Sequence, residues 1–368
     1  MPLVDDLEAA LATLAPSIVV DLSDEPVLGP LERFRLASRV LARGLPYVGP
    51  DFSLEPPPLD PFPLPSLAVI GTGKRVGKTA VTGYVARLLA EERDVVVVSM
   101  GRGGPPEPEE AEVRPALDDL LALSRAGRHA ASDYLETAAL AGVVTIGCRR
   151  CGGGLAGATA VSNVAAGAEL AAARGPDLVV FDGSGAAVPP VATGARLLVA
   201  GAHQPPELAA GYLNAYRVLV SDLVVLTMAE EGSRYAELRT AMHDVKPDIP
   251  VIACVLRPRP TSSVAGRRVA YFTTAPEEAH EVLAGHLRAE HGADVVGISG
   301  NLARREALRA DLDRLEAEVY LVEIKAAAID VVAEEAERRA IELVFADNEV
   351  VPLPGEGDLD RELRRLVS

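Results

Sequence analysis

Residues 71–79 combine glycines with cations in a pattern suited to phosphate groups. Glycines let backbone N–H groups turn toward an anion, and the N-terminus of a following helix adds partial positive charge. Lys78 is expected to reach the terminal phosphates of a nucleotide, and the Thr79 hydroxyl to contact Mg²⁺. The strict G-x-x-x-x-G-K-[ST] pattern is missed at one position, because Thr72 stands where its first glycine belongs. We therefore predict that ATP binds along this loop, at Gly71, Thr72, Gly73, Lys74, Arg75, Val76, Gly77, Lys78 and Thr79.

An acidic residue at the end of a second strand supplies the other half of such a site. Residues 178–181 are all apolar, and Asp182 follows them directly. Ligands bind at the carboxyl ends of parallel strands, so Asp182 is placed to hold Mg²⁺ together with Thr79. The alternative is an ordinary surface turn after a strand.

Further cations lie in two glycine-rich segments and at one strand end. Arg102 stands among three glycines, and Arg149 and Arg150 stand between two cysteines and precede three glycines. Adjacent guanidinium groups offer paired N–H donors to phosphate oxygens. Lys325 closes a predicted strand, where it is a candidate phosphate contact. The alternatives are plain loops and surface cations.

The sequence offers no convincing acid–base pair or metal cluster. The six histidines are scattered without metal-ligand spacing, and we interpret them as surface residues. Cys148 and Cys151 form a C-x-x-C pair, but no second pair exists to complete a zinc site. The chemistry that these residues favour is therefore the positioning and neutralisation of phosphates.

The overall charge excludes several classes of partner. The chain has 36 Lys and Arg against 53 Asp and Glu, a net charge of −17, so its average field repels nucleic acids and anionic membranes. Only four residues are lysines, and two of them fall within residues 71–79. No apolar run approaches the length of a membrane-spanning helix, and the acidic N-terminus lacks a signal-peptide pattern, so we expect a cytoplasmic protein. Scarce Gln and Asn fit both a heat-adapted organism and high-GC codon usage.

The elements that must position these residues fall into three stretches. Residues 1–65 are predicted as a short helix–strand–helix segment that ends in a proline-rich linker, because six prolines occur within residues 54–65. Residues 66–262 alternate between helices and apolar strands, which indicates a buried parallel sheet. Residues 263–368 continue this alternation and are predicted as a smaller α/β domain. The strands expected in the core are residues 67–70, 94–99, 177–181, 195–200, 223–227 and 251–255, and those of the smaller domain are 268–273, 294–299, 319–324 and 342–345.

The loop at residues 71–79 resembles that of dethiobiotin synthetase and its relatives in the P-loop class that includes MinD-type ATPases. Several segments together resemble the cyclic 2,3-diphosphoglycerate synthetase family from about residue 17 onward. The methanogen members of that family carry a longer N-terminal domain than the residues that precede the core here. The segments that carry the resemblance are residues 24–28, 33–36, 46–49, 71–79, 99–104, 148–153 and 323–330.

This resemblance implies a P-loop NTPase core, ATP and Mg²⁺ as cofactors, and 2,3-diphosphoglycerate as the small-molecule substrate. The implied reaction joins the two substrate phosphates into an internal anhydride. A homodimer is expected for this class. The alternatives are a kinase that acts on 2-phosphoglycerate and a MinD-like nucleotide switch. The cations implied as catalytic are Lys74, Arg75, Lys78, Arg102, Arg149, Arg150 and Lys325.

Overall fold

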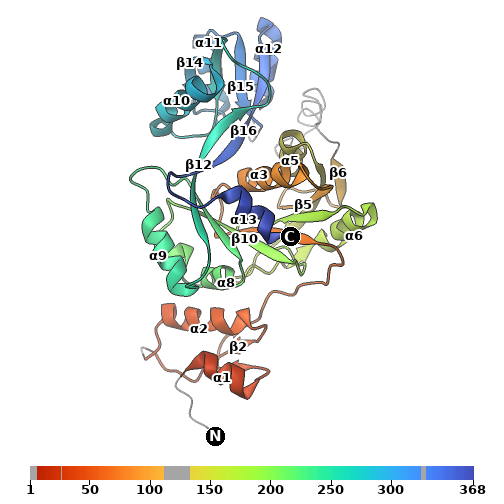
Figure 1. Ribbon diagram of the computed structural model, residues 1–368, viewed down its shortest axis with the longest axis vertical. Coiled ribbons are helices and arrows are strands. Elements are labelled where there is room, and N and C mark those ends of the chain that lie inside the picture. The colour runs from red at the N-terminus through yellow and green to blue at the C-terminus, as the bar shows by residue number, and fades with distance from the viewer. Residues whose placement is uncertain (1–5, 26, 112–132, 325–328) are drawn as a thin grey trace.

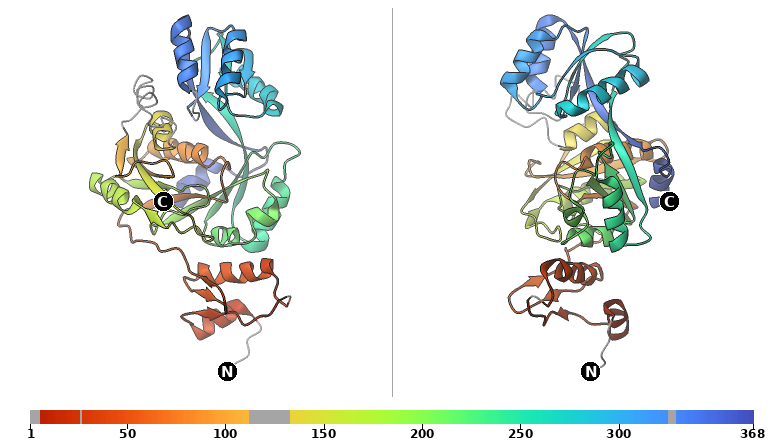
Figure 2. Two further views of the ribbon diagram at one scale, coloured as in Figure 1. Left: turned by 180° about the vertical axis from the view of Figure 1, so that it is seen from behind. Right: turned by 90° about the vertical axis from the view of Figure 1, so that its left-hand side faces the viewer.

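The computed structural model describes residues 6–25, 27–111, 133–324 and 329–368. Along its longest axis the molecule has a small N-terminal unit, a central core and a C-terminal unit (Figure 1). The two outer units lie at opposite ends of the core, as the rotated views also show (Figure 2). Of the predicted site residues, Lys325 lies outside the described residues. No helix within the described ranges is long and apolar enough to cross a membrane.

The N-terminal unit packs on the core through its second helix, α2. The apolar face of α2, which includes Val40 and Leu41, contacts Leu213 and Tyr216 at α8 of the core. The helices and the first strand follow the sequence prediction, and two further short strands complete a small sheet in the order β1-β2-β3. These elements are α1 (Leu7–Leu14), β1 (Val19–Val20), α2 (Pro30–Ala42), β2 (Tyr47–Val48), β3 (Ser53–Leu54) and the core helix α8 (Asn214–Leu219).

A buried carboxylate, Asp21, holds this unit together. Its side chain accepts hydrogen bonds from Arg33 Nε at 2.7 Å, the Tyr47 hydroxyl at 2.8 Å and the Ser23 N–H at 2.8 Å. Burial by itself raises the pKa of Asp21, but these donors outweigh it and hold the pKa well below its usual range. The network therefore stabilises the ionised form.

Asp21→Asn should lower the unfolding temperature of the N-terminal unit by about 4 °C or more at pH 7. The lowered pKa means that Asp21 stabilises the fold above the pKa of an unfolded aspartate, about 3.9, and that this contribution disappears as the pH falls from about 5. The difference between wild type and variant should therefore shrink on acidification. Thermal unfolding of both proteins at pH 7 and pH 3 measures the difference in unfolding temperature. An equal difference at the two pH values would contradict a stabilising role for the ionised Asp21 carboxylate.

The proline-rich linker is extended, as predicted, but it lies against the core. The Phe62 ring packs edge-on against Phe181 of the central sheet, with centroids 5.1 Å apart. Asp60 forms a parallel bridge with Val191. These contacts connect the N-terminal unit to the core along the linker as well as through α2.

The core is a parallel sheet with helices on both faces, which confirms the predicted α/β fold. Its central strand β4 (Ser66–Gly71) is buried throughout, and its apolar residues 67–70 alternate between two apolar clusters. The neighbouring strands stand in the order β7-β5-β9-β4-β10-β11-β12, with the short β6 and β8 pairing antiparallel to β7. Their bounds are β5 (Val95–Gly101), β6 (Glu109–Ala111), β7 (Val144–Cys151), β8 (Val161–Ser162), β9 (Leu178–Asp182), β10 (Ala195–Gly201), β11 (Leu223–Thr227) and β12 (Val251–Pro260). The helices are α3 (Lys78–Ala90), α5 (Asp133–Ala141), α6 (Val164–Arg174), α7 (Pro206–Ala209), α8 and α9 (Tyr235–Val245).

Strand β7 had no counterpart in the sequence prediction. Residues 148–154 are a glycine-rich segment in which no strand is predicted, whereas β7 continues to Cys151. Gly147 at its centre makes room for the Tyr134 ring, since a Cβ there would lie 2.6 Å from that ring. A glycine that weakens the local strand pattern is thus required by packing.

The C-terminal unit shares its sheet with the core. Strand β12 extends beyond the predicted residues 251–255 and pairs antiparallel with β16 from Cys254 to Pro260. Strand β16 then pairs with β15, so the strands of the core and the C-terminal unit form one continuous sheet that ends in the order β16-β15-β13-β14. The elements of this unit are β13 (Arg268–Phe272), the 3₁₀ helix Glu277–Ala279, α10 (His280–His291), β14 (Asp294–Ser299), α11 (Arg305–Arg314), β15 (Val319–Glu323), α12 (Ile329–Arg339) and β16 (Glu342–Pro352).

The end of the chain returns to the core instead of staying with the C-terminal unit. Helix α13 (Leu359–Leu366) buries Leu359 and Leu363 in the same apolar cluster as α3. Tyr84 of α3 also donates a hydrogen bond to Asp360. The apolar face of α13 thus packs on the core, and the predicted division of the chain at residues 262 and 263 stays a prediction (Figure 1).

Candidate active site

The predicted phosphate loop connects β4 to α3. Gly77 has φ of 75°, and a Cβ there would lie 2.9 Å from Leu256 Cδ1, so this position requires glycine for both conformation and space. Arg75 also adopts a left-handed conformation, with φ of 60°. The Thr227 hydroxyl donates to Val76 O at 2.7 Å and fixes the loop from the neighbouring strand β11.

The departure from the strict loop pattern has a structural counterpart. The Thr72 hydroxyl donates to Gln204 Oε1 at 2.6 Å, and the same oxygen accepts the Gly201 N–H at 3.1 Å. Asn214 Nδ2 donates to Thr72 O at 3.2 Å. The base of the loop is therefore fastened to β10 and α8. Sequence reasoning missed Gln204 and Asn214, and no local pattern marks either of them.

The sheet brings the other predicted segments to the same edge. Asp182 at the end of β9 stands beside Val69 of β4 and Ser99 of β5 in the strand register. Gly101 of β5 pairs with Arg149 of β7. The ends of four neighbouring parallel strands thus meet where ligands bind in such sheets.

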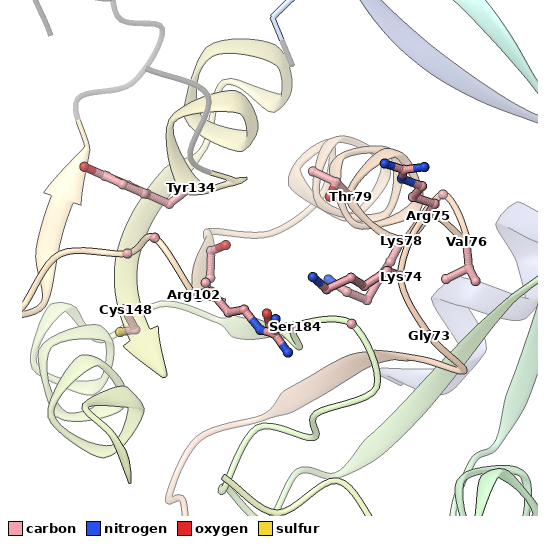
Figure 3. A pocket seen from close by; sticks show the side chains of 16 residues that line it. Gly73, Lys74, Arg75, Val76, Lys78, Thr79, Arg102, Tyr134, Cys148 and Ser184 are labelled. Atoms are coloured by element: carbon pink, nitrogen blue, oxygen red, sulfur yellow. The ribbon is translucent and has the colours of Figure 1, made fainter. Parts of the chain in front are cut away.

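A cavity of about 420 Å³ opens at this edge. Lys74 of the phosphate loop and Arg102 of the loop after β5 extend into it from opposite sides, and Ser184 lies near Arg102 (Figure 3). Arg75 also lines the cavity, but its guanidinium points away from that cluster (Figure 3). The lining residues described here include no Asp, Glu or His. The predicted residues that line the cavity are Gly73, Lys74, Arg75, Val76, Gly77, Lys78, Thr79 and Arg102.

Lys78 and Asp182 form an ion pair at the base of the cavity. The Lys78 ammonium donates to Asp182 Oδ1, which also accepts the Thr82 hydroxyl at 2.9 Å. The Lys78 side chain is 8% exposed and Asp182 is fully buried. An ammonium group has three donors, so Lys78 has further capacity for a phosphate oxygen.

The residues beside this pair fit a Mg²⁺ ion. The Ser99 hydroxyl is buried, and within the described part of the chain it has no hydrogen-bond partner. It lines the cavity with Thr79 and neighbours Asp182 in the register. Hydroxyl and carboxylate oxygens are the hard donors that Mg²⁺ prefers. Ser99 was not among the predicted ligands.

Arg149 and Arg150 do not line the cavity. Arg149 Nε donates to Gly104 O at 2.5 Å. Arg150 is 3% exposed and donates to Gly152 O at 2.5 Å and to Ser184 O at 2.8 Å. Burial lowers the pKa of Arg150, and the nearby Arg102 adds to the effect. These hydrogen bonds hold the loops that form the cavity wall, and the role of the two arginines as phosphate contacts stays a prediction.

The cysteines form neither a disulfide nor a described metal cluster. Cys148 is buried beside the cavity, and burial raises the pKa of its thiol to about 12. Cys151 is exposed and also free. Within the described ranges no group of three His, Cys, Asp or Glu side chains is arranged to hold a metal ion.

Comparisons with known proteins identify related chains along the whole length. Family models match the P-loop domain of cyclic 2,3-diphosphoglycerate synthetase at residues 66–255, its C-terminal domain at 260–349 and its N-terminal domain at 2–55. A cyclic 2,3-diphosphoglycerate synthetase of Rubrobacter xylanophilus is 55% identical, covering 99% of this chain and 84% of that protein. The corresponding proteins of Thermococcus gammatolerans and Methanothermus fervidus are 46% and 41% identical over 94% and 95% of this chain, and 80% and 79% of theirs.

One solved structure is similar over much of the chain. It is LpxK from Aquifex aeolicus in complex with ATP, with a TM-score of 0.46 and 14% identity over 84% of this chain and 91% of that one.

Proposed function

Since the chain belongs to the cyclic 2,3-diphosphoglycerate synthetase family, we propose that it uses ATP to join the two phosphates of 2,3-diphosphoglycerate into an internal anhydride. ADP and inorganic phosphate are the other products. The observation that carries this proposal beyond the family relationship is the cavity, whose described walls provide four cations and backbone amides but no carboxylate or imidazole.

The reaction proceeds in two displacements. An oxygen of one substrate phosphate attacks the γ-phosphorus of ATP, and the bond to ADP breaks. An oxygen of the neighbouring substrate phosphate then attacks the phosphorus that has been activated, and inorganic phosphate leaves. Both attacking oxygens are ionised near neutral pH, so neither step requires a general base. A cavity whose described lining contains lysines and arginines but no Asp, Glu or His fits this requirement.

The central difficulty is repulsion between two polyanions in a chain of net charge −17. Two like unit charges 4 Å apart repel by about 4 kcal/mol at an effective dielectric constant of 20. Lys78 and Arg75 stand on the loop proposed for ATP, Arg102 stands across the cavity, and Lys74 extends between them. Lys74, Lys78 and Arg102 neutralise and align the two substrates, which supplies most of the expected catalysis. The catalytic role of Arg75 stays a prediction, because its guanidinium points away from these cations.

Mg²⁺ is the proposed metal, held by Thr79, Ser99 and Asp182. When bound it supplies positive charge to the phosphate oxygens of ATP. Thr82 orients the Asp182 carboxylate by its hydrogen bond.

The expected homodimer stays a prediction. Light scattering of the purified chain would measure its oligomeric state.

Acceptor-dependent release of two products tests the proposed function. With Mg-ATP, addition of 2,3-diphosphoglycerate should stimulate the release of ADP and inorganic phosphate in equal amounts. ADP without inorganic phosphate, formed with 2-phosphoglycerate, would indicate a kinase instead. Equal release with and without either acceptor would contradict both activities.

Gly104→Ala should reduce kcat/KM for this reaction by about a hundredfold, because a Cβ at Gly104 would lie 2.0 Å from Cys148 O. The loop must then move, and Arg102 moves with it, and a displacement of about 1 Å can cost this much. Gly103→Ala is the matched control, since a Cβ there has open space and should cost far less. Steady-state kinetics measures kcat/KM for both variants. Equal losses of kcat/KM would contradict the proposed importance of the close contact at Gly104.

A further inference from the structure

Arg217 on α8 is a buried cation whose hydrogen-bond partners are all uncharged. Its side chain is 2% exposed. Nε and Nη2 donate to Ala186 O at 2.9 and 2.5 Å, and both terminal nitrogens lie 3.3 Å from Leu155 O. Nη1 donates to Leu213 O at 2.9 Å and to Asn214 Oδ1 at 3.1 Å. A buried guanidinium compensated only by carbonyl and amide oxygens is costly, and burial lowers the pKa of Arg217 to about 10.

These contacts hold a loop that forms part of the cavity wall. Ala186 belongs to the turn after β9, in which Ser184 and Ala187 exchange backbone hydrogen bonds. Ser184 and Gly185 of this turn line the cavity. The turn also touches the phosphate loop, since a Cβ on Gly71 would lie 3.0 Å from Gly185 O. A displacement of this turn therefore reaches the phosphate loop directly.

Two buried arginines hold the turn at different points. Arg150 donates to Ser184 O and Gly152 O, whereas Arg217 donates to Ala186 O and Leu155 O. Each guanidinium thus joins the turn after β9 to the segment after β7. The backbone at Gly157 packs tightly against the Arg217 guanidinium. A Cβ on Gly157 would lie 3.1 Å from Arg217 Nη2 and 2.9 Å from Ala186 O.

The helix that carries Arg217 also holds the phosphate loop. Asn214 accepts a hydrogen bond from Arg217 and donates one to Thr72 O. Helix α8 also packs against α2 of the N-terminal unit, and Ser38 donates to Tyr212 O at 3.1 Å just before α8 begins. Helix α8 therefore connects the N-terminal unit to two loops of the site.

We infer that Arg217 is a positioning residue for the proposed reaction: its guanidinium fixes the turn at residues 183–187 against the phosphate loop without touching either substrate. The planar arrangement of its donors allows one side chain to bridge Ala186 O and Leu155 O, which a lysine cannot reproduce. Only the predicted effect on the acceptor-dependent reaction rests on the proposed function. The predicted effect of Arg217 on nucleotide binding at the phosphate loop can be measured without any acceptor.

Mg-ADP binding by the full chain, measured by calorimetry, tests the inference. Arg217→Met should weaken the affinity about tenfold, equivalent to about 1.4 kcal/mol, and should lower kcat of the acceptor-dependent reaction as well. Arg217→Lys, which keeps the charge but not the bridge, should lie between wild type and Arg217→Met. Leu223→Ala serves as the control for lost stability. It removes a buried side chain at the start of β11, whereas Thr227 at the other end of that strand contacts the phosphate loop. It should bind Mg-ADP like wild type below its unfolding temperature.

Unchanged Mg-ADP affinity in Arg217→Met would overturn the inference, as would an equal loss in Leu223→Ala. If Arg217→Met does not fold, Arg217→Lys decides, since wild-type affinity in that variant would show that the bridge is dispensable. The proposed function fails by a different result, namely a wild-type chain that binds Mg-ADP but forms no cyclic product.

Discussion

Lys78→Met is expected to lower kcat of the ATP-dependent reaction by at least about a thousandfold. Lys78 lines the cavity at the start of α3, and its ammonium is placed between Asp182 and the space proposed for the terminal phosphates. Charge that develops on the transferring phosphoryl group loses its nearest fixed cation in the variant. Rapid-quench measurement of ADP formation at saturating ATP separates this loss from weaker binding.

The same substitution affects stability, because Lys78 and Asp182 are a buried pair. Removing one partner of such a pair costs about 3–5 kcal/mol. The double variant Lys78→Met with Asp182→Asn should recover much of that stability but none of the activity. A double variant as unstable as Lys78→Met would contradict the importance of the pair. A Lys78→Met chain with near-normal kcat would contradict the proposed role of Lys78.

Arg102→Met is expected to lower kcat/KM for 2,3-diphosphoglycerate by about a hundredfold or more, with a smaller effect on the KM for ATP. Arg102 lies opposite the phosphate loop and extends toward Ser184, so its charge faces the side of the cavity that we propose for the acceptor (Figure 3). The net charge of −17 makes this local cation more important, because the surrounding field repels the substrate. The rate should also fall less steeply with added salt than in wild type, since one attractive charge is missing.

Arg309→Met is the matched control for this charge. Arg309 is an exposed arginine of α11 in the C-terminal unit, and its removal changes the net charge equally. Its activity and salt dependence should remain those of wild type. Equal effects of the two substitutions would show that only the overall charge matters, which would contradict a local role for Arg102.

The parts of this site that the sequence predicts are those encoded in consecutive residues. The loop at residues 71–79 carries its glycines, cations and following helix in one segment, and Asp182 follows an apolar strand directly. Both sit at the carboxyl edge of the sheet as expected, because parallel strands align their ends. Arg102 reaches the cavity for the same reason.

The remaining parts depend on partners that are distant in the chain. Thr72 and Gln204 are 132 residues apart, and nothing near either one indicates their hydrogen bond. Arg150 is predicted as a phosphate contact, and nothing in the local sequence indicates that its two terminal nitrogens donate to Gly152 O and Ser184 O. The pairing of β12 with β16 joins the C-terminal unit to the core sheet, and it depends on a register that alternation of apolar residues does not specify.

Phosphorus NMR of the purified chain with Mg-ATP and 2,3-diphosphoglycerate tests the central proposal most directly. We expect new anhydride signals from the acceptor, together with ADP and inorganic phosphate in equal amounts, and none of these with Lys78→Met. Unchanged diphosphoglycerate signals beside slow ATP hydrolysis would contradict the proposed acceptor.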